Sequence, residues 1–363
     1  MYLNPVKVIE SNSWEKTYEQ FSKNLKIKKP LLVTSTGCLS RNKLADFFNP
    51  NSIYSNILPD PTLESCNSAI KKSNLFDHDG LIAIGGGSVM DTAKVILAAM
   101  NTELRDFNKL LEIKDSYKKR IPSIFVPTTH GTGSEVTKWA TVWDLKNKKK
   151  LSLSHTDLYP KFVILDQNLT LTLPLKTSII TILDALSHSF ESIWNKNAND
   201  ISSNYAIEAI TNIINNIDLF KSDPKNPVIR KKLLIASNKA GLAFSNTKTA
   251  AAHSISYPLT IHFSIPHGVA ASISLVPILN LTKSLIKKPL DVILKNTSCT
   301  FDELTKRINL ISKDVVPFRL NKWGVGKKNI DYLAQESFTK GRMENTIVDI
   351  NKDLVMKILN QIY

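Results

Sequence analysis

The chain has 363 residues, of which 42% are hydrophobic, and its formal net charge is +15 at pH 7. This length is enough for two domains with sizeable cores. No apolar run approaches the roughly 20 residues that span a bilayer, and the first residues lack the pattern of a signal peptide. The three cysteines are too few and too far apart for a disulfide framework or a thiolate metal site. We therefore expect a cytoplasmic protein with no membrane partner.

The high positive charge has two interpretations. Its lysines are scattered along the chain, and runs such as Lys148-Lys149-Lys150 lie next to turn-like residues. No zinc-finger, RNP-type or basic-zipper pattern accompanies them, so we expect no nucleic-acid partner. The charge then reflects either a lysine-rich solvated surface or the steering of an anionic substrate.

Short apolar runs alternate with helical stretches in the first half of the chain. Continuous apolar strands separated by helices predict a parallel, doubly wound sheet. From Pro174 onward helical periodicity takes over. We therefore predict an N-terminal domain over residues 1–173 and a helical domain over residues 174–363. The predicted strands lie at residues 31–34, 52–54, 81–84, 123–126 and 162–165.

Two loops in the first domain are suited to phosphate groups. Gly85-Gly86-Gly87-Ser88 joins a predicted strand to a helix, and a second loop rich in glycine, threonine and serine covers residues 127–135. Glycines at such a turn let a pyrophosphate approach the backbone and the start of the helix. The first loop alone could be a tight turn without a ligand, because it matches neither GxGxxG nor the Walker pattern. Two such loops at the carboxyl ends of parallel strands indicate a nucleotide site.

Asp184 and His188 stand four residues apart in an apolar, glycine-free stretch that reads as a helix, so they project from one face. His253 and His267 follow in the same half of the chain. One carboxylate and three imidazoles suit a divalent first-row metal. The alternative for the first two residues is a capping or surface pair.

Together, in this order and spacing, these motifs resemble the iron-containing (group III) alcohol dehydrogenase family. The resemblance implies a Rossmann-like N-terminal domain, a helical C-terminal domain (dehydroquinate synthase-like) and a nicotinamide cofactor, NADPH or NADH, in the cleft between them. It implies Fe²⁺ or Zn²⁺ as the metal, held by Asp184, His188, His253 and His267. The cofactor-binding residues that we expect are Ser35, Gly85, Gly86, Gly87, Ser88, Asp91, Thr128, Thr129, Thr132 and Ser134.

Three stretches are similar to the branch of the family that reduces phosphonoacetaldehyde: residues 139–144, 253–260 and 341–345. A dianionic phosphonate needs cations in its pocket. Lys138, Lys248 and Arg342 are the candidates for that role.

The chain departs from the family pattern at two positions. Tyr257 stands where many members have a histidine near the reacting carbonyl, so the proton donor is water, Tyr257 or His262. His130 stands where alanine is common.

Ser35 occupies the position where NAD-selective members carry an aspartate. Its neutral side chain, with Arg41 and Lys43 nearby, predicts that NADPH is accepted at least as well as NADH.

We thus predict an enzyme that carries out the metal-dependent, NAD(P)H-linked reduction of a small anionic aldehyde, namely phosphonoacetaldehyde to 2-hydroxyethylphosphonate, and that forms a homodimer. The alternatives are a general short-chain alcohol dehydrogenase of the same family, a cyclase of the dehydroquinate-synthase type, and a non-catalytic nucleotide-binding protein.

Overall fold

The structure is a computed structural model that describes residues 4–72 and 77–363. The chain divides into two compact units. Unit 1 consists of the described residues up to Thr129 together with Ser134–Leu173. Unit 2 consists of His130–Gly133 and Pro174–Tyr363, so the tip of the second glycine-rich loop belongs to unit 2.

Unit 1 is built on a six-stranded sheet with the order β1-β8-β5-β4-β2-β3. Every pair of neighbouring strands is parallel, as predicted. The five predicted strands are present, each within two residues of its expected limits. The strands are β1 (Lys7–Ser11), β2 (Pro30–Thr34), β3 (Ile53–Tyr54), β4 (Gly80–Gly85), β5 (Ser123–Pro127) and β8 (Phe162–Asp166).

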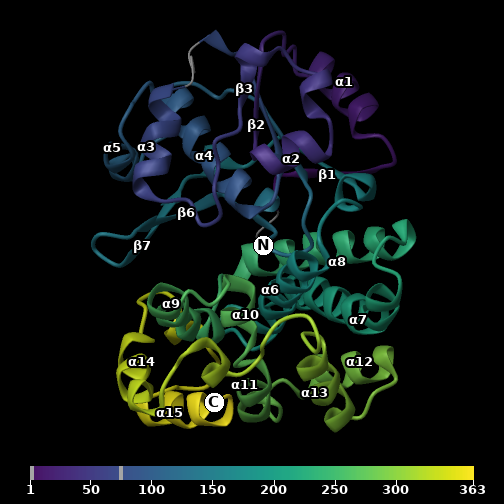
Figure 1. The fold of residues 1–363 in the computed structure, drawn as a ribbon, viewed down its shortest axis with the longest axis vertical. Coiled ribbons are helices and arrows are strands. Elements are labelled where there is room, and N and C mark those ends of the chain that lie inside the picture. The colour runs from purple at the N-terminus through teal and green to yellow at the C-terminus, as the bar shows by residue number, and fades with distance from the viewer. Residues whose placement is uncertain (1–3, 73–76) are drawn as a thin grey trace. The chain divides into compact units, whose positions relative to one another are not determined.

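The central strands are buried on both faces, which explains their continuous apolar runs. Figure 1 shows helices on both sides of the sheet, with α1 and α2 on one side and α3, α4 and α5 on the other. The helices are α1 (Trp14–Asn24), α2 (Thr36–Arg41), α3 (Leu63–Lys72), α4 (Gly87–Thr102) and α5 (Phe107–Glu112).

Three strands were not predicted. β1 is an edge strand whose residues are exposed or half-buried, so it lacks an apolar run. β6 (Trp139–Asp144) and β7 (Lys149–Ser154) form an antiparallel hairpin outside the main sheet. β7 begins with two lysines and has no continuous apolar run, so its sequence does not predict a strand.

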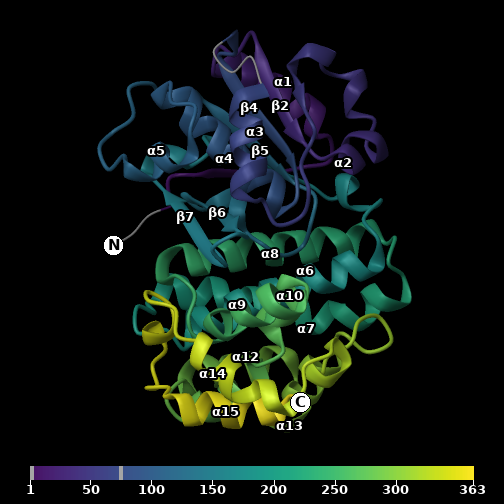
Figure 2. The ribbon, with the colours of Figure 1, turned by 60° about the vertical axis from the view of Figure 1, so that its left-hand side comes forward.

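Unit 2 is helical throughout, which confirms the second half of the predicted fold class, and its helices are packed around one apolar core (Figure 2). α6 packs against α7, α8, α9 and α10. Nearly every side chain of α6 from Ser178 onward is buried, as expected for a helix that is apolar on all sides. The helices are α6 (Leu175–Ile193), α7 (Asp200–Ser222), α8 (Pro227–Thr247), α9 (Ala251–Phe263), α10 (His267–Ser272), α11 (Leu275–Thr282), α12 (Lys287–Thr297), α13 (Phe301–Leu310), α14 (Ile330–Glu336) and α15 (Lys352–Gln361).

Among the residues that the structure describes, no single helix has the length and apolar character needed to cross a membrane. One bent pair, His267–Thr282 with Lys287–Thr297, meets those criteria on length and composition alone.

Candidate metal centre and cofactor loops

Helix α6 supplies the first two candidate ligands. Asp184 and His188 lie one turn apart in its buried second half, with 3% and 5% of their surfaces exposed. A carboxylate placed this deep needs positive charge or hydrogen bonds to offset its lost hydration. The imidazoles of the other three candidate ligands lie around this carboxylate and stabilise its charge.

His253 lies in the first turn of α9, and His267 is the first residue of α10. Gly268 lets α10 approach α6 closely, because a Cβ atom there would collide with the Ile180 carbonyl. Ser187 strengthens this packing by donating a 2.7 Å hydrogen bond to the Ala271 carbonyl. The glycine after His267 therefore has a structural role, because it lets α10 bring His267 close to α6.

The three candidate histidines converge on one oxygen atom of Asp184. Asp184 Oδ1 lies 3.9 Å from His188 Nε2, 3.6 Å from His253 Nε2 and 3.8 Å from His267 Nε2. Ligand atoms held about 2.1 Å from one ion in a tetrahedron lie about 3.4 Å from each other. The observed separations thus leave room for one ion among the four side chains.

The donor atoms fit a divalent metal. Asp184 Oδ1 and His253 Nε2 are buried and have no hydrogen-bond partner among residues 4–72 and 77–363. Asp184, His188 and His253 can all reach a single ion. His267, with 26% of its side chain exposed, is the ligand on the open side. One carboxylate and three imidazoles do not discriminate between Fe²⁺ and Zn²⁺.

The charges of the centre favour ionised aspartate and neutral His188. Burial acts to raise the pKa of Asp184, but the neighbouring imidazoles outweigh burial and hold that pKa well below its ordinary value. Burial lowers the pKa of His188 to about 4, so this imidazole is neutral at pH 7 and can bind a metal. Burial also acts to lower the pKa of His253, but Glu191 and Asp184 raise it to about 9.

Two further residues hold the imidazoles in place. Phe244 stacks on His188 with ring centroids 4.1 Å apart, and the ring of His253 lies 4.6 Å from His188 on a nearly parallel plane. Glu191 contacts His253 through both carboxylate oxygens. Sequence reasoning missed Glu191, although its position three residues after His188 puts it on the same face of α6.

Tyr257 and His262 occupy different surroundings on α9. Tyr257 lies one turn after His253, is buried, and accepts a 3.3 Å hydrogen bond from Arg342 Nε. His262 lies near the end of α9, where its Nε2 is 2.9 Å from the hydroxyl of the exposed Tyr332. The structure therefore brings Tyr257, but not His262, together with a candidate anion-binding residue.

Arg342 belongs to a segment, residues 341–346, whose hydrogen bonds connect it to the start of α9. Glu344 folds back onto this segment and accepts hydrogen bonds from the backbone N–H groups of Gly341 (2.5 Å) and Arg342 (3.2 Å). Arg342 Nη1 donates to the Gly341 carbonyl at 2.8 Å. The hydroxyl of Thr346 accepts from the backbone N–H of Ala251, two residues before His253. The segment thus ties Arg342 to the start of α9.

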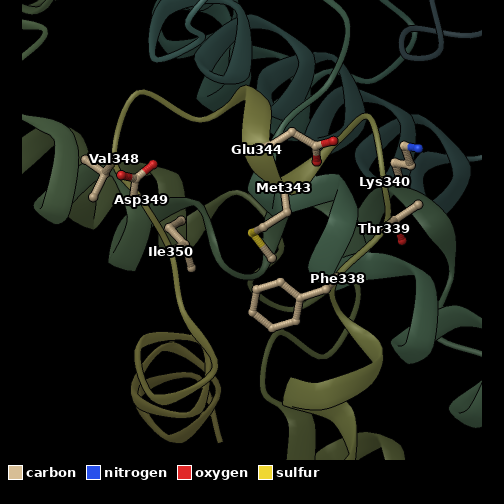
Figure 3. Close-up of a pocket in the computed structure, with 8 residues that line it drawn as sticks. All are labelled: Phe338, Thr339, Lys340, Met343, Glu344, Val348, Asp349 and Ile350. Atoms are coloured by element: carbon tan, nitrogen blue, oxygen red, sulfur yellow. The ribbon is translucent and has the colours of Figure 1, made fainter.

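The same segment lines a cavity of about 340 Å³ (Figure 3). In Figure 3 the side chains of Phe338 and Met343 point toward each other. None of the eight lining residues is a candidate metal ligand, so this cavity lies outside the metal centre.

The two candidate lysines are placed differently. Lys248 is exposed and caps the C-terminus of α8 in a left-handed conformation (φ 66°), with its backbone N–H donating to the carbonyl of Phe244. Lys138 belongs to unit 1 and is half-buried.

In unit 1, the first glycine loop joins β4 to α4 as predicted. Gly85 ends β4, Gly86 is the N-cap of α4, and Gly87 and Ser88 open the helix. A Cβ on Gly86 would meet the Thr129 side chain at 2.8 Å, so the two glycine-rich loops lie against each other here. Thr128 is buried and donates from its backbone N–H to the Gly85 carbonyl at 3.0 Å. Thr132, in the tip that belongs to unit 2, is half-buried.

Asp91 and Ser134, both expected to bind the cofactor, bond to each other. Ser134 Oγ donates a 2.6 Å hydrogen bond to Asp91, whose second oxygen accepts from the backbone N–H of Thr141. The fully buried Lys94 lies 3.9 Å from Asp91. Both carboxylate oxygens of Asp91 are therefore engaged within the chain.

Ser35 follows β2 and caps the short helix α2, its hydroxyl accepting from the backbone N–H of Cys38 at 3.2 Å. Arg41 folds back toward this cap: a Cβ on Gly37 would lie 2.7 Å from Arg41 Nη1.

Two family models together match most of the chain. The model for iron-containing alcohol dehydrogenase matches residues 5–167, and the model for the C-terminal part of the Fe-containing alcohol dehydrogenase family matches residues 178–363. The two matches meet close to the division between the two units.

Individual proteins show the same likeness. The chain is 28% identical to an NADPH-dependent butanol dehydrogenase of Clostridium saccharobutylicum, covering 94% of this chain and 93% of the relative. It is 31% identical to a sulfoacetaldehyde reductase of Bilophila wadsworthia, covering 69% and 66%. The structure of a sulfoacetaldehyde reductase from Bifidobacterium kashiwanohense in complex with NAD⁺ superposes with a TM-score of 0.89 at 23% identity, covering 100% and 98%. The chain belongs to the iron-containing alcohol dehydrogenase family, and it is an NAD(P)-linked oxidoreductase acting on aldehydes or alcohols.

Proposed function

We propose that this enzyme reduces a small aldehyde carrying an anionic group, with phosphonoacetaldehyde, reduced to 2-hydroxyethylphosphonate, as its substrate. The observation that carries the proposal is the hydrogen bond from Arg342 Nε to Tyr257. It links a guanidinium to α9, one turn after the candidate ligand His253.

The chemistry follows from the donor set. Asp184 and the three histidines would hold the ion, and Phe244 keeps His188 in its orientation. A bound divalent metal would supply Lewis-acid activation of the carbonyl, and a bound nicotinamide would supply the hydride. The Tyr257 hydroxyl accepts a hydrogen bond from Arg342, and a phenol of this kind is one candidate for the proton donor, beside water and His262.

Arg342 is suited to a phosphonate or sulfonate. Its Nη2 has no hydrogen-bond acceptor within the described residues, and a guanidinium binds such oxyanions through two parallel hydrogen bonds. Arg342 and Glu344 form no ion pair within 4 Å in the described part of the chain, and the Glu344 carboxylate accepts from the backbone N–H groups of Gly341 and Arg342.

A sulfonate is the second candidate anion. The relative from Bilophila wadsworthia is a sulfoacetaldehyde reductase, and its 31% identity favours this class of substrate. The runner-up function is a general short-chain alcohol dehydrogenase, which the similarity to a butanol dehydrogenase supports.

We further propose that NADPH is used at least as well as NADH. Ser35 carries no charge that would repel a 2′-phosphate, and Arg41 lies beside the cap of α2. The similarity to an NADPH-dependent dehydrogenase supports the same choice. The expected homodimer and the lack of a nucleic-acid partner stay predictions, which light scattering and a gel-shift assay would test.

The test is an anaerobic assay of the iron-loaded enzyme with phosphonoacetaldehyde, sulfoacetaldehyde, propanal and butanal. We expect kcat/KM for the preferred anionic aldehyde to exceed that for the neutral aldehydes at least about tenfold, which requires ~1.4 kcal/mol of differential binding. Arg342→Gln should remove this preference and leave turnover of propanal intact. Arg319→Gln is the matched control, because this arginine is exposed and its side chain donates to the Gln361 carbonyl near the C-terminus.

Equal or better turnover of butanal or propanal by the wild-type enzyme would reject the anionic substrate. Loss of the preference in Lys138→Gln or Lys248→Gln, with Arg342→Gln unchanged, would move the anion site to the lysine. A preference for sulfoacetaldehyde over phosphonoacetaldehyde would keep the class and change the anion.

A further inference from the structure

We propose that Glu191 is a positioning residue of the metal centre. It fixes the imidazole of His253 with a proton on Nδ1, so that Nε2 is the atom presented to the ion. This inference rests on the metal centre and not on the identity of the aldehyde.

The contact between the two residues is short, doubled and buried. Glu191 Oε2 lies 2.5 Å from His253 Nδ1, and Glu191 Oε1 accepts a 3.0 Å hydrogen bond from the backbone N–H of the same residue. The side chain of Glu191 is fully buried on α6, and that of His253 is 2% exposed. The Glu191 carboxylate therefore binds both the ring and the backbone N–H of His253.

This arrangement determines which nitrogen can bind a metal. An ionised carboxylate only accepts hydrogen bonds, so the atom facing it, Nδ1, carries the proton. The neutral ring then has its lone pair on Nε2, which points at Asp184 Oδ1 from 3.6 Å and has no hydrogen-bond partner among residues 4–72 and 77–363. Carboxylate partners of this kind also raise the basicity of metal-binding histidines.

His188 is held differently from His253. His188 is held by stacking on Phe244, and its acidic neighbour within 4 Å in the described part of the chain is Asp184. Glu191 also adds a second buried negative charge. With Asp184, it would balance the two charges of a divalent ion.

A purely structural role is the competing explanation, since the backbone hydrogen bond already joins α6 to α9. Glu191→Gln separates the two roles. The amide can keep the backbone contact through its carbonyl, but its NH₂ group then faces His253 Nδ1 and favours the tautomer protonated on Nε2, which cannot bind metal. If the amide flips, its NH₂ group faces the backbone N–H instead, and two donors oppose each other.

The experiment uses metal-free full-length protein titrated with Zn²⁺ and Co²⁺ against a competing chelator. We expect Glu191→Gln to weaken metal binding by about 10- to 100-fold and to alter the visible spectrum of the Co²⁺ form. Nitrogen NMR of the metal-free protein above pH 9, where the imidazole of His253 is neutral, should show the proton on Nδ1 in the wild type and on Nε2 in Glu191→Gln. Glu208→Gln is the matched control, because this carboxylate on α7 pairs with Lys239 at the surface.

Glu191→Asp keeps the charge with a shorter reach and serves if Glu191→Gln fails to fold. It should retain the wild-type tautomer and bind metal more weakly than the wild type. Metal affinity within twofold of the wild type, with an unchanged Co²⁺ spectrum, in either folded variant would overturn the proposal. No aldehyde enters these measurements, so a failure of the proposed substrate leaves this test unaffected.

Discussion

Replacing Lys94 by methionine should destabilise unit 1 by about 3–5 kcal/mol. The ammonium group is fully buried in α4, and its three N–H donors are shared among four oxygen acceptors within hydrogen-bond distance. The acceptors are the carbonyl and hydroxyl of Ser134, both at 2.7 Å, the hydroxyl of Thr137 at 2.9 Å and the carbonyl of Trp139 at 2.7 Å. Lys94 thereby fixes the chain that follows the second glycine-rich loop.

The size of the expected loss in stability follows from the polar groups that Lys94→Met leaves buried without their partner. Methionine fills the space, but Asp91 loses its only buried counter-ion within 4 Å among the described residues, and four acceptors lose their donor. Burial raises the pKa of Asp91 and lowers the pKa of Lys94 to about 8. Both charges have therefore lost their hydration, and each depends on the other for stabilisation. Removing one partner of such a pair costs more than the pair contributes. For a unit of this size the loss corresponds to a fall in Tm of roughly 6–20 °C.

Thermal and urea unfolding followed by circular dichroism would measure this loss. The double variant Asp91→Asn/Lys94→Met should recover part of it, because it no longer buries an unpaired carboxylate. The loss in Lys94→Met should also shrink as the pH falls, since Asp91 is then neutralised in the folded state. Lys109→Met, at an exposed position of α5, is the control. A loss below 1 kcal/mol in Lys94→Met, or a double variant as unstable as the sum of the single ones, would refute the reasoning.

Three further predictions concern the metal, the cofactor and pH. His188→Ala or His267→Ala should abolish metal retention and activity while leaving the helical circular dichroism signal largely intact, and a fully active His267→Ala protein without metal would contradict the assignment. Ser35→Asp should lower the ratio of kcat/KM for NADPH to that for NADH, because a carboxylate repels the 2′-phosphate; an unchanged ratio would count against Ser35 as a determinant. Burial lowers the pKa of His130 to about 3, so below pH 6.5 the unfolded chain binds a proton that the folded chain refuses until about pH 3. The free energy of unfolding should therefore decrease by about 1.4 kcal/mol for each unit that the pH falls from 6.5 to 3, and His130→Leu should remove that decrease. Parallel plots of the free energy of unfolding against pH for the two proteins would disprove it.

The sequence predicted the elements whose burial is uniform. β4 and β5 are buried along their whole length, and their apolar runs reveal them. β1 has no such run, because it is an edge strand with polar residues along it, and β7 is rich in lysine. Pattern reasoning therefore finds the centre of the sheet and misses its edge and the hairpin.

The candidate site shows the same limit. Residues one helical turn apart, such as Asp184 and His188, can be paired from spacing alone. Glu191 and His253 are 62 positions apart, and Tyr257 and Arg342 are 85 apart, so only the fold brings each pair together. The cofactor contact expected of Asp91 stays a prediction, and the fold adds what the motif did not reveal: its two oxygens bond to Ser134 and Thr141.

The two proposals are connected through charge. Asp184 and Glu191 together supply two negative charges, which balance a divalent ion and leave no net positive charge for a second anion. A phosphonate or sulfonate bound near that centre consequently needs a cation of its own, and Arg342 is the candidate that a hydrogen bond joins to α9. Changes at Glu191 should then reduce the turnover of charged and neutral aldehydes by similar factors, because both depend on the ion. Changes at Arg342 should reduce only the turnover of charged aldehydes.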